Sequence, residues 1–575
     1  MNTLQSPLQA KARLIVSLPA FATLILSTLG KPTARAEAPT VDTPFGISTS
    51  ASSTNSIDKW GPQISAAGVT WLRGFRAFSD LEPKEGEWKW ESLDKVLNAA
   101  SASHLNVSGM FLYGVSWIDS SKSGFPVANL PAWSEYASNV VKHCAGKVKY
   151  YEVWNEPPNF ARNAKAADYA KLVVAAYDAA KAADSTCQIG LCAASSGVNW
   201  LAQTIAAGAA DHFDYITVHP YEALEVADDG AEAEYMAIVP TIRKMLAALD
   251  PKKQDAPIWF TESGTPADKK HTPEDQARML VKLYTMAIAQ GVVQVNWFEG
   301  KDGDSGPFGL IDGQGKTRLS YTAMSQLTRV LGPHPKYLGW LSLDGKHYGF
   351  LFQGATGTVL STWAARGTTA EVKFGGNVEI VEPATGATTK ASSYALTEMP
   401  VLVLNVPPAI VSAAAANRAK PYLNWGGDYA GAKSVSIEFG PQNKELGLHQ
   451  IHPDANSTAV EIDGVSARDC SKSGGQNFIV DPAFFSFTTR PIVITAVVRR
   501  KEKAKDPGFN LKYESTPGWK GPGWYTVPQG SEWVTKTWKI EDPLFVGLWG
   551  YQFGFNSDGT EHSEYYIRSL KVELQ

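Results

Sequence analysis

Short apolar runs alternate with longer helical patterns between about residue 41 and residue 332. The runs cover residues 45–49, 69–73, 107–113, 148–154, 188–192, 215–219, 258–261 and 292–297. Each run is short and apolar enough to be a buried strand. The pattern therefore predicts eight strands, separated by segments of helical length.

The segments between the runs have the period of amphipathic helices. One predicted helix covers residues 164–183, and its apolar stripe consists of Tyr169, Leu172, Val173, Ala176, Tyr177 and Ala180. Another is predicted to begin after Thr272 as its N-cap, with Pro273 at the first helical position and Gly291 as its stop. These segments complete an alternation of strand and helix.

Eight strand-helix units predict an α/β fold, a TIM (β/α)8 barrel over residues 41–332, because that fold typically takes ~250 residues. An open, doubly wound sheet would alternate in the same way. However, no GxGxxG motif follows the first run, as it does in dinucleotide-binding sheets of that kind. The barrel is therefore the preferred prediction.

Beyond residue 332 the pattern changes to short strands separated by turn residues. Residues 333–406 are predicted to form a small antiparallel β domain packed on the barrel. Two prolines and an alanine-rich stretch then predict a linker over residues 407–420. Residues 421–575 contain the apolar run 491–498 and alternating aromatic residues over 549–555. They are predicted to form a jelly-roll-like β-sandwich, a carbohydrate-binding-like module.

The N-terminal residues 1–36 have the composition of a cleavable signal peptide. They contain four basic residues and no acid, an apolar stretch over residues 14–29, and the small-residue site Ala34-Arg-Ala36. We therefore expect a secreted or periplasmic protein with no membrane segment in its mature form. Cleavage would change the formal net charge from −4 to −8, because four positive charges leave. An acidic mature chain argues against nucleic acid as a partner.

The four cysteines leave two possibilities open. Cys144 ends a predicted helix and Cys187 begins a predicted strand, so these two could form a disulfide in an oxidising compartment, or both could stay free. No cysteine or histidine spacing resembles a zinc site. We expect neither a metal nor an organic cofactor.

Two of the predicted strands deliver a glutamate at their carboxyl end. Glu156 follows the run 148–154, and Glu262 follows the run 258–261. An acid at the end of a buried strand is costly unless it serves chemistry. The carboxyl ends of barrel strands form the active-site face, and a pair of carboxyls there is the equipment of glycoside hydrolysis.

These positions resemble clan A of the retaining glycoside hydrolases. That clan carries an Asn-Glu acid/base after strand four and a glutamate nucleophile after strand seven, which implies that Glu156 is the acid/base and Glu262 the nucleophile. The order Trp-Asn-Glu-Pro, His-Pro-Tyr and Thr-Glu-Ser is most similar to family 39, with family 5 next. The third run departs from some family 5 members, because it ends in Tyr113-Gly114 without a histidine.

The resemblance also implies a set of substrate-binding residues. Arg73 ends the second run, where the clan keeps an arginine near the nucleophile, and Asn155 matches the residue that binds the sugar 2-hydroxyl. His219 and Tyr221 end the sixth run, where the clan has an aromatic residue whose hydroxyl hydrogen-bonds to the nucleophile. Trp297 ends the eighth run, where the clan places an indole under the sugar.

The proposed roles require the two carboxyls to differ in charge. Arg73 and Tyr221 are expected to keep Glu262 ionised through charge and hydrogen bonding, while apolar neighbours such as Trp154 are expected to keep Glu156 protonated. Four further acids are interpreted as structural or substrate-contacting, namely Glu152, Glu222, Glu299 and Asp302.

The predicted function is hydrolysis of a β-linked polysaccharide or oligosaccharide, with internal cleavage favoured over a β-xylosidase-like exo action. A catalytically silent carbohydrate-binding protein is the alternative from another class, since tryptophans gather around residues 518–524. The stretch 303–307 is similar to a serine-protease nucleophile loop, but it lacks the second glycine after the serine and follows an eight-fold strand-helix alternation. The sequence leaves the oligomeric state open.

Overall fold

The computed structural model describes residues 43–120, 124–342, 348–420, 427–472, 475–502, 504, 507–547, 549–557 and 564–575. The predicted signal peptide lies outside these residues. Within them, no helix combines the length and the apolar character that crossing a membrane would need. The described residues belong to one unit.

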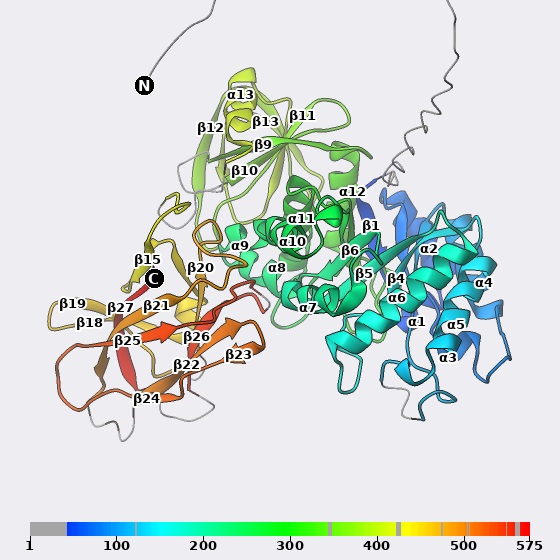
Figure 1. Ribbon diagram of the computed structural model, residues 1–575. Helices are drawn as coiled ribbons and strands as arrows, with labels where there is room; N and C mark the ends of the chain where they lie inside the picture. Colours follow the sequence, from blue (N-terminus) through cyan, green and yellow to red (C-terminus); the bar gives the residue numbers. More distant parts are fainter. Residues whose placement is uncertain are drawn as a thin grey trace, which may run out of the picture. The chain divides into compact units, whose positions relative to one another are not determined.

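Eight parallel strands close into a barrel, as the alternating pattern predicts (Figure 1). They are β1 (Phe45–Ser48), β2 (Trp71–Arg73), β3 (Asn106–Phe111), β4 (Val148–Val153), β5 (Gln188–Ala194), β6 (Tyr215–His219), β7 (Ile258–Ser263) and β8 (Gln294–Phe298). The pairing of β1 with β8, in which Ile47 lies opposite Trp297, closes the ring. The predicted TIM barrel is confirmed.

Helices follow the strands and bury their apolar stripes against the barrel. The main ones are α2 (Ile57–Ala66), α4 (Glu91–Ala102), α5 (Leu130–His143), α6 (Ala166–Ala183), α7 (Val198–Thr204), α8 (Tyr221–Asp228), α10 (Ile238–Leu249), α11 (Pro273–Ala289) and α12 (Leu319–Leu331). Shorter helical segments are α1 (Ala51–Thr54), α3 (Phe78–Leu81), η1 (Val127–Asn129), η2 (Ile205–Ala209), α9 (Glu232–Met236) and η3 (Pro251–Lys253). In α11 the Thr272 hydroxyl accepts from the Asp275 amide, and Gly291 follows the helix with φ +82°, as predicted.

Four aromatic rings fill the interior of the barrel on the side of the amino ends of its strands. Trp71, Tyr150, Tyr215 and Trp259 come from β2, β4, β6 and β7, and their ring centroids lie 4.6 to 6.1 Å apart. Strands on different sides of a barrel can bring their side chains together only inside it. Because side chains alternate along a strand, the residues two positions further on also point inward, nearer the carboxyl ends.

The six strands after the barrel form one antiparallel sheet in the order β13-β12-β14-β11-β10-β9. They are β9 (Lys336–Ser342), β10 (Tyr348–Gln353), β11 (Thr358–Thr362), β12 (Ala370–Val381), β13 (Thr388–Leu396) and β14 (Val401–Leu404). The predicted linker differs from the structure, because Pro408–Asn417 forms helix α13. Proline at the first helical position and a run of alanines favour a helix, and Ala414 is buried in the core of this sheet.

Two further antiparallel sheets enclose a second core in residues 427–575. One sheet contains β15 (Ser434–Glu438), β16 (Lys444–Leu446), β18 (Thr458–Ile462), β19 (Val465–Asp469), β21 (Ile492–Arg500), β25 (Val534–Ile540) and β27 (Tyr565–Leu574). The other contains β17 (Leu448–Ile451), β20 (Gln476–Val480), β22 (Gly508–Ser515), β23 (Gly518–Lys520), β24 (Trp524–Thr526) and β26 (Phe553–Asn556). The short helix α14 (Pro453–Asn456) follows β17. The predicted β-rich C-terminal region is confirmed.

The cysteines are free in the described part of the chain, which includes all four of them. Cys144 and Cys187 are both buried, and neither is bridged. The disulfide that the sequence left open is therefore absent from this structure.

Candidate active site

A buried ion pair forms the floor of the site. Arg73 lies two residues beyond Trp71 on β2, and Glu152 lies two residues beyond Tyr150 on β4, so both point into the barrel above the aromatic rings. Arg73 donates to Glu152 Oε2 from Nε at 2.9 Å and from Nη2 at 2.8 Å. Burial opposes the charge of Arg73, but the Glu152 and Glu262 carboxylates outweigh it and raise the pKa of Arg73 above its usual range.

The same guanidinium orients two residues that the sequence analysis selected. Arg73 Nη1 lies 2.7 Å from Glu262 Oε2, and Nη2 lies 2.8 Å from Asn155 Oδ1. A planar guanidinium fixes the direction of every bond it donates. Arg73 thus holds residues from β7 and from the loop after β4 in one arrangement.

A β-bulge turns Glu262 toward the interior. Phe260 pairs with Val295, but Ser263 pairs with Trp297, so β7 advances three residues while β8 advances two. Without the extra residue, side chains would alternate along β7, and Glu262 would point to the opposite face from Thr261. The bulge breaks this alternation. Glu262 Oε2 can then reach Arg73, and Oε1 accepts a 2.9 Å hydrogen bond from the Tyr221 hydroxyl.

Glu156 reaches the same space from the other side of the site. It follows β4 in a left-handed backbone conformation, with φ +48°, and its Oε1 lies 2.9 Å from His219 Nδ1. His219 Nε2 lies 3.2 Å from Thr261 Oγ1, so a threonine on the neighbouring strand orients the ring. One carboxylate oxygen of Glu156, one of Glu262 and the His219 nitrogen lie within 4.8 Å of one another.

The charge environment of Glu156 differs from the sequence expectation. Burial raises the pKa of Glu156, but the hydrogen bond and charge of His219 and the charge of Arg73 outweigh burial, so the pKa lies below its ordinary value. The expected protonation by apolar neighbours such as Trp154 is therefore not what the structure favours in the free protein. The reason is that His219 is aimed at the carboxylate, which sequence spacing does not reveal.

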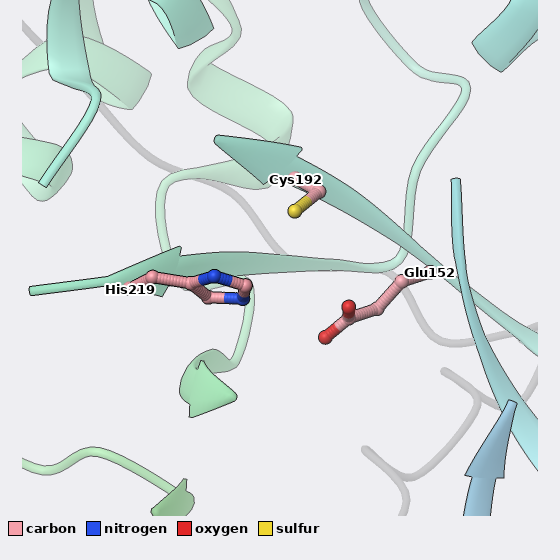
Figure 2. Close-up of side chains that lie close together, drawn as sticks. All are labelled: Glu152, Cys192 and His219. Atoms are coloured by element: carbon pink, nitrogen blue, oxygen red, sulfur yellow. The ribbon is translucent and has the colours of Figure 1, made fainter. Parts of the chain in front are cut away.

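Below the two glutamates lies a buried group of three possible metal ligands. Figure 2 shows Glu152, Cys192 and His219 pointing from three strands into one space, and one ligand atom of each lies within 4.8 Å of the others. Burial raises the pKa of the Cys192 thiol well above its usual value, so sulfur there carries its proton at neutral pH. Arg73 also occupies Glu152 Oε2. A protonated thiol and a guanidinium suit a cation poorly, because metal ligation requires a thiolate.

The structure does not bring Trp297 to the site. Its indole has no exposed surface, packs in the main core and donates to the Phe308 carbonyl at 3.1 Å. A ring with no accessible surface cannot stack on a sugar. The inward side chain is that of Phe298, whose ring centroid lies 6.5 Å from that of Tyr221. The strand β8 continues to Phe298, and consecutive side chains of a strand point to opposite faces, so Phe298 and not Trp297 faces the site.

Tyr113 is a site residue that the sequence analysis did not select. It follows β3, its hydroxyl hydrogen-bonds to Asn155, and burial raises its pKa to about 12. Its position directly after a barrel strand was the available signal. Glu299 and Asp302 fit the structural interpretation, since Glu299 accepts from Ser50 and Ser53 and Asp302 pairs with Arg318.

Comparison with solved structures finds several proteins to which this chain is similar. A family 39 glycoside hydrolase from the gut symbiont Bacteroides cellulosilyticus WH2 superposes with a TM-score of 0.55 and 21% identity, over 64% of this chain and 81% of that chain. A glucosidase from Croceicoccus marinus gives a TM-score of 0.42 and 12% identity, over 94% and 98% of the two chains. A GH5_18 protein from Bifidobacterium longum subsp. infantis gives 0.40 and 17%, over 50% and 78%.

The sequence matches no family model and no curated protein. Among the three structures above, the family 39 enzyme has the highest TM-score, 0.55. At 21% identity, this similarity concerns the fold. The chain has the barrel fold of a family 39 glycoside hydrolase, which the sequence resemblance led us to expect.

Proposed function

We propose that the protein is a retaining β-glycoside hydrolase that works by double displacement. The supporting observation is the closeness of its two candidate carboxylates. One oxygen of Glu156 and one oxygen of Glu262 lie within 4.8 Å of each other. Retaining enzymes place their carboxyls about 5 to 5.5 Å apart, whereas inverting enzymes leave about 6.5 to 9.5 Å for a water molecule. The separation favours direct attack by one of the two carboxylates.

In the first step, a Glu262 oxygen attacks the anomeric carbon, and the bond from that carbon to the leaving oxygen breaks. The protonated form of Glu156, which the lowered pKa makes the minor form of the free protein at neutral pH, gives its proton to the leaving oxygen. In the second step, Glu156 takes a proton from water as the water oxygen attacks the same carbon. The ester bond to Glu262 breaks, and both carboxyls return to their starting state.

The surrounding residues have distinct tasks in this scheme. Arg73 and Tyr221 hold one oxygen of Glu262 each, so the carboxylate keeps the orientation that attack needs. The Asn155 Oδ1 atom is fixed by Arg73, and its amide nitrogen can donate to the sugar 2-hydroxyl. His219 controls the charge of Glu156.

The proposed substrate is a β-linked polysaccharide cleaved internally by an exported enzyme. The leader-like N-terminus supports export, and the modest loops after the third and fourth runs, as read from the sequence, support an open groove. Exo cleavage of the β-xylosidase kind is the runner-up. Sizing the first products from a panel of plant, algal and microbial polysaccharides distinguishes the two, because monosaccharide as the only early product would refute internal cleavage.

The mechanism itself is tested by stereochemistry. Proton NMR of the first product should show the same anomeric configuration as the substrate. Inversion would refute the double displacement. Binding of glycans without any hydrolysis would favour the silent carbohydrate-binding alternative.

A further inference from the structure

The loop that carries Glu156 also presents an exposed aromatic ring. Phe160 is 62% exposed. The described residues include four large hydrophobic side chains that are exposed, namely Phe160, Leu249, Trp524 and Trp549. Phe160 is the most exposed of the four, and it lies four residues beyond the candidate acid. Single exposed apolar residues are ordinary, so its neighbours decide whether it has a role.

Phe160 is the outer end of a row of aromatic rings. Its ring centroid lies 6.2 Å from that of Tyr113, at an interplanar angle of 40°. Tyr113 packs edge-on against Trp154 at 5.2 Å and hydrogen-bonds to Asn155. The row therefore leads from the buried end of β4, past a residue of the site, to solvent.

The backbone holds Phe160 in an unusual conformation. Its φ of +55° lies in the left-handed region, which is uncommon for a bulky aromatic residue. Trp154 and Glu156 in the same loop also have positive φ, at 72° and 48°. Strained residues cluster where a site needs a particular geometry, and here a residue in the left-handed region carries an apolar ring that is exposed to water.

We propose that Phe160, backed by Tyr113, forms a stacking platform for the sugar on the leaving-group side of the cleaved bond. This inference rests on the proposed function, and it assigns a binding residue within that site. Glu156 must protonate the oxygen that joins the reacting sugar to its leaving group, so its own loop borders the leaving group. Arg73 on β2 and Glu262 on β7 hydrogen-bond to each other, and in the proposed mechanism they border the reacting sugar.

The chemistry of the ring fits that occupant. The C–H face of a sugar ring is apolar, and packing it on an aromatic face removes both surfaces from water. A platform on this side binds a second sugar beyond the cleaved bond. An enzyme that cleaves within a chain has such a sugar in every productive complex.

The test compares two leaving groups on one glycone. Cellotetraose, xylotetraose and mannotetraose are offered to the full-length protein, and whichever is cleaved is paired with the β-glycosyl fluoride of the same glycone. Fluoride leaves without occupying the platform. The ratio kcat/KM reports glycosylation for both substrates, so the comparison isolates contacts to the leaving group.

We expect Phe160→Ala to lower kcat/KM on the oligosaccharide by about tenfold and to leave the fluoride within twofold of wild type. Phe160→Tyr should restore the oligosaccharide rate, and Leu249→Ala, which removes an exposed side chain at the end of α10, should change neither rate. An unchanged melting temperature confirms that Phe160→Ala is folded.

Equal losses on the two substrates, or no loss on the oligosaccharide, would overturn the platform and leave the hydrolase assignment standing. A wild-type protein that cleaves none of these oligosaccharides, none of the fluorides and none of the polysaccharides in the panel above would overturn both.

Discussion

Replacing Tyr221 with phenylalanine removes one oxygen atom from the site and should slow glycosylation strongly. The hydroxyl donates a 2.9 Å hydrogen bond to Glu262 Oε1, while Arg73 holds Oε2. Burial and the neighbouring Glu262 and Glu156 carboxylates raise the pKa of Tyr221 well above its usual value, so the phenol remains a donor throughout the working pH range. The variant loses one of the two restraints on the nucleophile.

The size of the effect follows from the kind of bond. A hydrogen bond to a charged group contributes about 1.5 to 3 kcal/mol. Since about 1.36 kcal/mol of transition-state stabilisation corresponds to a tenfold change in rate, kcat/KM should fall by about 10-fold to 150-fold. The assay is initial-rate kinetics on a substrate that the wild-type protein hydrolyses.

The matched control is Tyr215→Phe. The Tyr215 hydroxyl is buried in the barrel and has no hydrogen-bond partner among the described residues. Its removal leaves no donor or acceptor behind, so activity should stay within twofold of wild type, roughly the change expected where no bond is lost. A Tyr221→Phe rate within threefold of wild type, or a loss of the same size in Tyr215→Phe, would refute the reasoning.

Three further predictions test the acid, its charge control and a buried carboxyl away from the site. Glu156→Gln keeps the shape of the acid without its proton, so it should lose about 10²-fold to 10⁴-fold on a glycan and much less on an activated aryl glycoside; equal losses would contradict the acid role. His219 lowers the pKa of Glu156, and proton donation is present below that pKa and lost above it. His219→Ala should therefore move the alkaline limb of the kcat/KM profile to higher pH, and a limb that stays or moves down would count against this. Burial and the nearby Glu514 and Asp481 carboxyls raise the pKa of Glu234 from 4.5 to about 8, so the folded state holds this proton more tightly than the unfolded state. The free energy of unfolding should then fall between about pH 4.5 and 8, by on the order of 5 kcal/mol. Glu234→Gln, which has no proton to lose, should melt above wild type at pH 8.5 but not at pH 4.5, and parallel melting curves across pH would rule this out.

The sequence by itself determined the barrel and the position of its two glutamates. Apolar runs predict strands, and the cap at Thr272 predicts a helix start, because these signals depend on neighbours within a few residues. Glu156 and Glu262 could be selected for the same reason, since each follows a run directly. The segment 407–420 shows the limit of this kind of reading. Its prolines and alanines suit either a linker or the helix α13. In the structure the helix forms, and Ala414 packs in the core of the neighbouring sheet.

The tertiary structure decided which way side chains point and what charge they carry. A bulge of one residue in β7 turns Glu262 inward, and the alternation of side chains along β8 places Phe298 instead of Trp297 toward the site. Similarly, the lowered pKa of Glu156 depends on His219, which is 63 residues away in sequence and 2.9 Å away in space. The physical reason is shared. Strand direction reverses with a single residue of register, and electrostatic forces act through distance in space, so neither is written in local spacing.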